Sequence, residues 1–235
     1  GRQLLRKLRQ IMTIEENLKA LRDGIAEAAI RAGRRPEEVK LIAVTKTVDE
    51  QRIKEAVAAG VDRIGENRVQ ELLQKYDAYG SAEKHLIGRL QTNKVKKVVG
   101  RVALIHSVDR LNLAQEIERC AKTVGVVCPV LIEVNLGCEP QKGGVAPEEL
   151  FDLAGAMLEM EHLKPLGLMT VPPVFEKEEA RKYFARLREL LFACNAALGT
   201  KMAELSMGMS FDYAEGILEG ATYVRIGTAL FGKRL

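Results

Sequence analysis

The chain has 235 residues, of which 47% are hydrophobic and 29% charged, an ordinary balance for a globular protein with a large core. Its 36 basic and 32 acidic residues are mixed along the sequence and give a net charge of +4, which argues against a nucleic-acid partner. No apolar run reaches the roughly 18 residues that cross a bilayer, and the basic N-terminus lacks the apolar region of a secretory signal. We expect no membrane partner and a cytoplasmic protein whose four cysteines are reduced thiols, with no metal site.

The N-terminal part of the chain predicts a helix over about residues 13–33. Apolar side chains recur there at helical spacing, and Gly33 with Pro36 ends the segment. The stripe consists of Ile14, Leu18, Leu21, Ile25 and Ala28.

Eight short apolar runs then alternate with segments of helical periodicity. The expected strands are Lys40–Thr45, Arg63–Gly65, His85–Gly88, Ala103–His106, Pro129–Asn135, Leu166–Val171, Glu204–Met207 and Tyr223–Ile226. Strands that alternate with helices are typical of parallel sheets. Eight such units without a linker predict an α/β fold, a single TIM-type (β/α)8 barrel with an extra N-terminal helix, as one domain over residues 1–235. A doubly wound open sheet is the alternative, but it normally has fewer strands and a Gly-rich first turn.

The helical segments between these strands carry recognisable end signals. Asp109 is predicted to be an N-cap and Gly125 a stop for one helix, and Pro147 suits the first turn of another. One basic cluster stands out, and a solvated helix face is the favoured interpretation, with an anionic-ligand or partner patch as the alternative. The cluster comprises Arg89, Lys94, Lys96, Lys97 and Arg101.

Reactive groups in a β/α barrel lie at the carboxyl ends of the strands. Lys46 directly follows the first strand, where its amine can attack an aldehyde and form a Schiff base; a lysine that reaches out to solvent is the alternative. Other polar side chains are expected at the remaining strand ends. They are Glu66–Asn67, Arg89, Gln91, His106–Ser107, Asn135, Ser206–Ser210 and Arg225–Thr228.

The loops after the seventh and eighth strands predict a phosphate site. Met209-Ser210 and Gly227-Thr228 offer hydroxyl and backbone N–H groups near helix starts, although each is also compatible with an ordinary turn. Together with Lys46 they suit an aldehyde that carries a phosphate. Arg225 in the eighth strand must be paired or face a ligand, since a buried unpaired guanidinium is costly. If it donates to the pyridine nitrogen of pyridoxal 5′-phosphate (PLP), it keeps that nitrogen unprotonated; a salt bridge inside the barrel is the alternative.

Several sequence runs resemble the YggS/PROSC family of pyridoxal phosphate homeostasis proteins, which is related to the barrel domain of alanine racemases. The resemblance covers nearly the whole chain. The runs are LIAVTKTVDEQRIKEAVAAG, GENRVQELLQKY, HLIGRLQTNK, HSVDRLNLAQEI, VLIEVNLG with the following KGG, GLMTVPP, LSMGMSFD and VRIGTALFG.

The resemblance implies a role for each of seven residues toward PLP as cofactor. It makes Lys46 the Schiff-base lysine and brings Asn67 close to the cofactor. It places Arg225 at the pyridine nitrogen. It assigns Met209, Ser210, Gly227 and Thr228 to the surroundings of the phosphate. Phe211 departs from the small or acidic residue expected beside that loop.

The resemblance implies PLP binding and vitamin B6 and amino-acid homeostasis, without catalytic residues. We expect a monomer lacking the second domain of alanine racemases, with apo forms of PLP-dependent enzymes as candidate recipients. A PLP-dependent enzyme of low racemase-like activity is the first alternative. A Schiff-base lyase acting on a phosphorylated sugar is the second, but few carboxylates lie near the strand ends to serve it.

Overall fold

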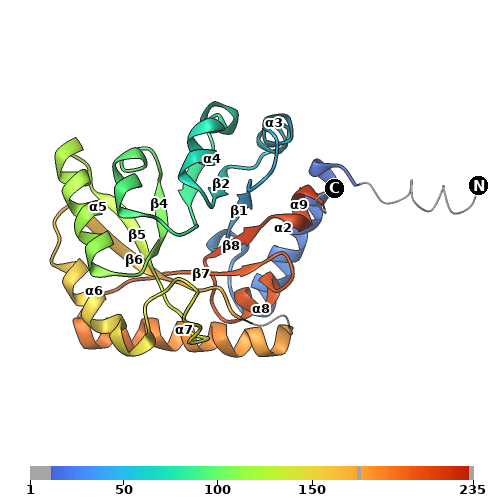
Figure 1. Cartoon of the computed structure of the whole chain (residues 1–235). Coiled ribbons are helices and arrows are strands. Elements are labelled where there is room, and N and C mark those ends of the chain that lie inside the picture. The colour runs from blue at the N-terminus through green and yellow to red at the C-terminus, as the bar shows by residue number, and fades with distance from the viewer. Residues whose placement is uncertain (1–11, 174–175, 233–235) are drawn as a thin grey trace, which may run out of the picture.

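The computed structural model describes residues 12–173 and 176–232. Eight parallel strands form a closed barrel in chain order, and β8 pairs with β1 to complete it (Figure 1). The strands are β1 (Lys40–Val44), β2 (Arg63–Glu66), β3 (Glu83–Leu86), β4 (Leu104–Val108), β5 (Cys128–Glu133), β6 (Leu163–Met169), β7 (Glu204–Met209) and β8 (Tyr223–Ile226). The predicted TIM-type barrel is confirmed, and the open-sheet alternative is excluded by the β1–β8 pairing.

Helices surround the barrel, as Figure 1 shows. The α-helices are α2 (Ile14–Arg31), α3 (Glu50–Ala58), α4 (Val69–Gln74), α5 (Leu111–Val124), α6 (Leu150–Leu158), α7 (Lys177–Leu198), α8 (Tyr213–Leu218) and α9 (Thr228–Phe231). The 3-10 helices are η1 (Pro36–Glu38), η2 (Tyr76–Tyr79), η3 (Thr92–Lys97) and η4 (Pro147–Glu149). None of the helices in the described residues is long and apolar enough to cross a membrane.

The predicted N-terminal helix corresponds to α2. Thr13 and Glu16 form a capping box at its start, in which each side chain accepts a hydrogen bond from the other residue's backbone. Its apolar stripe is buried against the barrel, and α2 also packs on α8 and α9. Asn17 donates to the Leu230 carbonyl at 2.9 Å, which fixes the C-terminal helix beside β8.

Two local predictions are wrong. Asp109 is not an N-cap: α5 begins after Arg110, while the Asp109 carboxylate pairs with Arg110 at 2.7 Å and accepts from the Gly144 N–H at 3.0 Å. His106 does not end β4, which continues to Val108. The basic cluster, predicted as a solvated helix face, lies largely on the 3-10 helix η3, of whose six residues only Val95 is buried.

The apolar core has two parts. The larger part lies between the strands and the surrounding helices. A smaller cluster fills the barrel interior and consists of Ile42, Leu104, Leu131, Met169 and Tyr223. The four cysteines are all unpaired, as predicted, and three of them are buried.

Candidate functional site

The predicted cofactor residues lie in one sector of the barrel mouth. Lys46 follows β1, Asn67 follows β2, Ser210 follows β7 and Gly227 follows β8. Because β1 pairs with β2 and β8, and β8 also pairs with β7, four neighbouring strands supply all of these residues. The carboxyl ends of parallel strands open at the same face, so the side chains share that face.

Lys46 sits on a firmly held backbone segment. Its side chain is partly buried, and no carboxylate of the described residues lies within 4.0 Å of its amine. The next residue, Thr47, has a positive φ of 60°, a conformation that costs a β-branched residue on the order of 1–3 kcal/mol. The Thr47 N–H donates to Glu71 at 3.2 Å and the Lys75 amine donates to the Thr45 carbonyl at 3.0 Å. These contacts fix the direction in which Lys46 leaves the strand.

Glu66 connects this segment to Asn67. Its fully buried carboxylate accepts from the Thr45 hydroxyl at 2.9 Å and from the Asn67 N–H at 3.0 Å. Burial raises the pKa of Glu66, and Lys75 at 3.7 Å opposes that effect. The Asn67 side-chain oxygen is itself buried and has no hydrogen-bond donor within the described part of the chain. An unpaired buried acceptor at a strand end is a group that a ligand can satisfy.

The position of Asn67 depends on Gly88. A Cβ on Gly88 would lie 2.1 Å from the Asn67 carbonyl oxygen, far inside contact distance. We expect Gly88→Ala to lower the free energy of unfolding by about 1–3 kcal/mol, because the backbone of one of these residues must move. Urea unfolding measures the change. Gly155→Ala is the matched control: its Cβ would meet Leu198 at an ordinary 3.6 Å inside α6, so a helix-propensity gain of up to about 1 kcal/mol is expected. Equal effects of the two variants would contradict the packing argument.

The predicted phosphate residues gather around the start of α9. The Ser210 hydroxyl accepts from the Gly227 N–H at 3.2 Å and from the Ala229 N–H at 3.1 Å. Asp212, whose pKa is raised by burial, accepts from the Met209 N–H at 2.7 Å and so shapes the end of β7. Thr228 is exposed beside Gly227. A hydroxyl and backbone N–H groups thus converge as in sites for phosphate oxygens.

The flanking side chains are open to solvent. Met209 is 37% exposed and Phe211 is 58% exposed. The amine of Lys177 lies 5.1 Å above the Phe211 ring, a cation–π contact. Phe211 therefore lies at the surface beside the predicted phosphate loop.

Arg225 is buried and forms no ion pair with any described residue. Only 4% of the residue is exposed, its Nη1 donates to the Ser206 hydroxyl at 2.6 Å, and its Nη2 donates to the Thr170 carbonyl at 2.9 Å. Among residues 12–173 and 176–232 no carboxylate lies within 4.0 Å, so the salt bridge considered from the sequence is not found. Burial lowers the pKa of Arg225 to about 10, while Glu133 and Asp212 act in the opposite direction. A guanidinium has five N–H donors, and those outside these two bonds can serve a ligand.

The sequence does not show the contacts among the polar side chains that connect to Arg225. The His106 Nδ1 lies 2.8 Å from the Ser206 hydroxyl, and the His106 Nε2 lies 3.0 Å from the His85 Nδ1. His106 and Ser206 are among the predicted strand-end residues, whereas His85 is predicted only as the first residue of a strand. Its place at the start of the apolar run His85–Gly88 is the available signal, since a buried imidazole needs polar partners.

Buried titratable groups make the stability depend on pH. Burial lowers the pKa of His85 to about 4 and that of His106 well below its usual value. Both histidines stay neutral in the folded state. Their contribution to the free energy of unfolding is therefore lost as the pH falls below about 6.5, where the unfolded histidines take up protons. Burial and the neighbouring Asp109 raise the pKa of Glu133 to about 7, so its contribution falls as the pH rises from about 4.3 to 7.

We expect Glu133→Gln to be more stable than the parent chain above pH 7 by about 1–3 kcal/mol, because a buried charge is removed. Below about pH 5 the advantage should vanish, since Glu133 is then protonated in the folded state. Urea unfolding at pH 5 and pH 8 measures both values. Glu148→Gln, on the exposed part of η4, should show no such pH dependence. A Glu133→Gln effect of equal size at both pH values would contradict the assignment.

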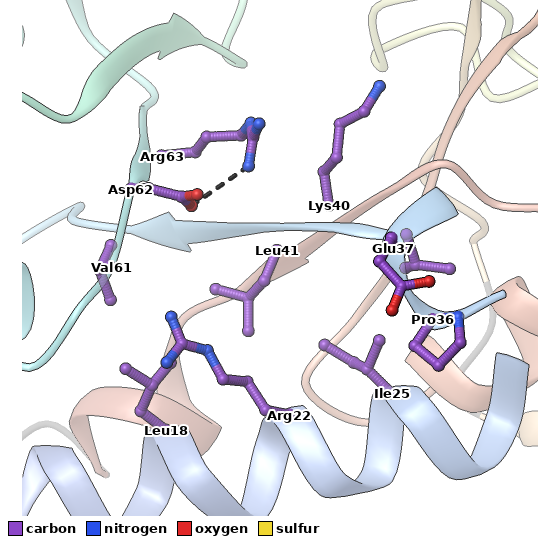
Figure 2. Close-up of a pocket in the computed structure, with 11 residues that line it drawn as sticks. Leu18, Arg22, Ile25, Pro36, Glu37, Lys40, Leu41, Val61, Asp62 and Arg63 are labelled. Carbon is purple, nitrogen blue, oxygen red and sulfur yellow. Dashed lines mark hydrogen bonds and ion pairs between the residues drawn. The ribbon is translucent and has the colours of Figure 1, made fainter.

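Two cavities lie at opposite ends of the barrel. A 280 Å³ pocket lies between α2 and the first residues of β1 and β2, and Figure 2 shows Arg22, Lys40 and Arg63 around it. Lys40 and Arg63 begin their strands, so this pocket is at the end of the barrel where chemistry is not expected. A larger cavity of 660 Å³ lies at the strand ends, and Asn67 and Arg89 line it.

The basic cluster divides between this larger cavity and solvent. Arg89 and Lys94 line the cavity together with Arg68 and Arg110. The other three members, Lys96, Lys97 and Arg101, are exposed. The described residues contain no group of histidine, cysteine and acidic side chains arranged to hold a metal ion.

Comparisons with known proteins place the chain in a family. The family model for the alanine racemase N-terminal domain matches residues 16–234. A pyridoxal phosphate homeostasis protein from Aquifex aeolicus is 50% identical over 222 residues, covering 93% of this chain and 97% of that protein. The protein of the same name from Escherichia coli K12 is 39% identical over 227 residues, covering 94% of this chain and 97% of that protein.

Solved structures agree with these matches. A structure of PipY from Synechococcus elongatus PCC7942 with PLP bound has a TM-score of 0.83 and 34% identity, and the match covers 94% of this chain and all of that one. An alanine racemase from Corynebacterium glutamicum shares the fold, with a TM-score of 0.69 and 18% identity over 92% of this chain and 62% of that chain. The chain belongs to the family of pyridoxal phosphate homeostasis proteins, whose barrel is that of the alanine racemase N-terminal domain.

Proposed function

We propose that this chain binds PLP as a Schiff base on Lys46 and serves in vitamin B6 and amino-acid homeostasis by holding the cofactor and passing it to PLP-dependent enzymes. The observation that carries the proposal is Arg225, a buried guanidinium with no carboxylate partner among the described residues, on the strand next to the one that leads to Lys46. A buried cation is costly unless something pairs with it, so its retention in the barrel favours a ligand above it.

The other residues of the sector fit the same cofactor. PLP has an aldehyde, a ring hydroxyl, a pyridine nitrogen and a phosphate. Within the described part of the chain, no carboxylate lies near the Lys46 amine, and the buried Asn67 side-chain oxygen has no donor. A ligand hydroxyl could supply that donor. Ser210 and Gly227, with the exposed Thr228, suit the phosphate oxygens. When bound, PLP supplies the aldehyde for the amine and a ring that withdraws electrons from an attached amino acid.

The relatives support this role over catalysis. Proteins of nearly the same length from Aquifex aeolicus and Pseudomonas aeruginosa are named pyridoxal phosphate homeostasis proteins, and PipY was solved with PLP bound. Arg225 at the pyridine nitrogen would keep that atom unprotonated, which makes the ring a weak electron sink. Slow turnover of amino acids is the consequence, although the racemase-type barrel makes racemase-like activity the second candidate.

Two further parts of the proposal concern the cellular compartment and the oligomeric state of the protein. Four unpaired cysteines suit a reducing compartment, which supports the cytoplasm. We propose a monomer, and sedimentation equilibrium over a range of concentrations measures it.

A transfer assay tests the proposed role. The protein is loaded with PLP, freed of excess cofactor by gel filtration and mixed with the apo form of an aminotransferase. We expect the aminotransferase to recover its activity. No recovery, from a protein that holds PLP stably, would contradict the carrier role.

Exchange of the alanine α-proton in deuterated water tests the alternative. We expect L- and D-alanine to exchange far more slowly than the roughly 1 s⁻¹ of an ordinary enzyme. Exchange with racemisation at that rate would show that the protein is an enzyme.

A further inference from the structure

A hydrogen-bonded chain of side chains runs through the barrel interior beneath the mouth. From Arg225 it passes to Ser206 at 2.6 Å, to His106 at 2.8 Å and to His85 at 3.0 Å. It ends at Glu83, whose carboxylate lies 3.3 Å from the His85 Nε2. Four strands contribute to the chain, and only Glu83 among its members is exposed.

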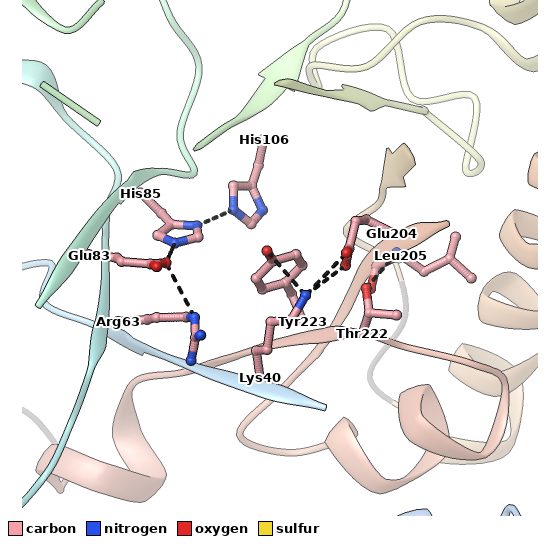
Figure 3. Close-up of polar contacts among 9 residues, drawn as sticks. All are labelled: Lys40, Arg63, Glu83, His85, His106, Glu204, Leu205, Thr222 and Tyr223. Atoms are coloured by element: carbon pink, nitrogen blue, oxygen red, sulfur yellow. Dashed lines mark hydrogen bonds and ion pairs between the residues drawn. The ribbon is translucent and has the colours of Figure 1, made fainter. Parts of the chain in front are cut away.

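Neighbouring side chains hold the two imidazoles in place, as Figure 3 shows. The Tyr223 ring lies 5.6 Å from both histidine rings, centroid to centroid. Lys40 lies over the other side of Tyr223 at 4.4 Å and pairs with Glu204 at 3.1 Å. Barrels of this kind usually fill their interior with branched apolar side chains, so this polar chain is not needed for packing alone.

The chemistry of the groups fixes the direction of every hydrogen bond. The Glu83 carboxylate can only accept, so the His85 Nε2 must carry the proton of a neutral imidazole. The His85 Nδ1 is then an acceptor, and the His106 Nε2 must donate to it. The His106 Nδ1 is left to accept from the Ser206 hydroxyl.

Ser206 is therefore committed as an acceptor toward Arg225. Its single proton points to His106, and its oxygen faces the guanidinium Nη1. Both imidazoles have lowered pKa values because they are buried, which agrees with the neutral forms that this direction requires. A protonated His106 would instead donate to the hydroxyl and would add a second cation beside Arg225.

We infer that His106 is a positioning residue for Arg225: through Ser206 it holds the guanidinium in the orientation that meets the cofactor, and His85 and Glu83 fix its tautomer. The inference rests on the proposed function, because it assigns these hydrogen-bonded side chains to the PLP site. The arrangement is the one by which a carboxylate orients a working histidine in other proteins, here extended across the interior of the barrel.

The tautomers can be measured without cofactor. Nitrogen-15 NMR of the imidazoles in the PLP-free protein should show both His85 and His106 as neutral rings protonated at Nε2. Glu83→Gln changes an exposed side chain and can be expected to fold. Because its amide can also donate, this variant should give a mixture of tautomers at both buried rings. Protonation of either ring at Nδ1 in the parent protein would overturn the inference.

Cofactor binding gives the second readout. His106→Phe keeps a ring but removes both polar contacts, and we expect its PLP dissociation constant to rise on the order of tenfold, with a shifted absorbance band. His106→Asn keeps an acceptor near Ser206 and should recover part of the affinity. His162→Gln is the matched control, because His162 is only half-buried and pairs with Glu118 outside this chain.

The outcomes distinguish the positioning role of His106 from the proposed function of the protein. Unchanged affinity and an unchanged band in His106→Phe would show that the chain does not act on the site. If His106→Phe does not fold, the PLP affinities of His106→Asn and Glu83→Gln replace it as the test. A PLP affinity equal to that of the parent protein in both variants would overturn the inference. A parent protein that binds no PLP would contradict the proposed function. The tautomers of His85 and His106 would still show whether the hydrogen bonds between Glu83 and Arg225 run in the inferred direction.

Discussion

Lys46→Ala is expected to abolish covalent attachment of PLP while leaving the barrel folded. The side chain makes no ion pair in the described structure, so its removal costs little stability. The residues that fix the neighbouring backbone, Thr47, Glu71 and Lys75, keep their contacts. Without the amine, the remaining groups of the mouth bind PLP only reversibly. We expect the visible absorbance of the purified protein to disappear and no PLP to be fixed by borohydride.

Lys54→Ala serves as the control for this prediction. Lys54 is an exposed lysine on α3, well outside the strand ends that form the mouth. Its replacement should leave both the absorbance band and the borohydride product unchanged. Covalent PLP that persists in Lys46→Ala would assign the Schiff base to a different lysine.

Arg225→Leu is expected to separate stability from cofactor retention. Arg225 is buried without a carboxylate partner in the described structure, and burial lowers its pKa to about 10, so its charge costs the folded barrel stability. An apolar side chain of similar volume removes that cost, and replacements of this kind are often neutral or stabilising. We expect the free energy of unfolding to change by less than about 1 kcal/mol, or to rise, because removing the buried charge offsets the loss of the donor to the Ser206 hydroxyl and to the Thr170 carbonyl.

PLP binding should respond in the opposite way. We expect the dissociation constant of Arg225→Leu to rise by about 10- to 100-fold, the effect of losing one or two hydrogen bonds from a charged donor. Equilibrium titration followed by absorbance measures it, beside urea unfolding of the same sample. Arg188→Leu is the control, because Arg188 pairs with Glu219 on the outer helices. If Arg225→Leu is largely unfolded while its folded fraction binds PLP as tightly as the parent protein, Arg225 serves the stability of the fold and not the cofactor.

The fold was predictable because its pattern is local. Each strand is a short apolar run, and each helix carries its own stripe and end signals, so the eightfold alternation is visible without any tertiary contact. Strand ends were less predictable. Thr45 is predicted within β1, and its N–H still donates to the Gly65 carbonyl of β2, but β1 ends at Val44 and the chain turns at Thr47, where φ is 60°. Asp109 looked like a cap, yet its contact with Gly144 in a later loop decides its role.

The candidate site was predictable to the extent that strand ends meet at one face of a barrel. That rule brings Lys46, Asn67, Ser210 and Gly227 together without knowledge of their contacts. It cannot show which interior side chains touch. Ser206 and His106 are separated by 100 residues in the chain, and their hydrogen bond depends on the register of strands that do not follow each other. The absence of a carboxylate beside Arg225 among the described residues likewise became visible only in three dimensions.

The most direct test of the account is to reduce the PLP-loaded protein with borohydride, digest it and locate the modified lysine by mass spectrometry. We predict one modified peptide that contains Lys46, with loss of the visible absorbance band on reduction. The same treatment of the Lys46→Ala protein should give no modified peptide. Modification of another lysine with Lys46 intact, or a loaded protein without any reducible linkage, would contradict the claim that the barrel holds PLP through Lys46.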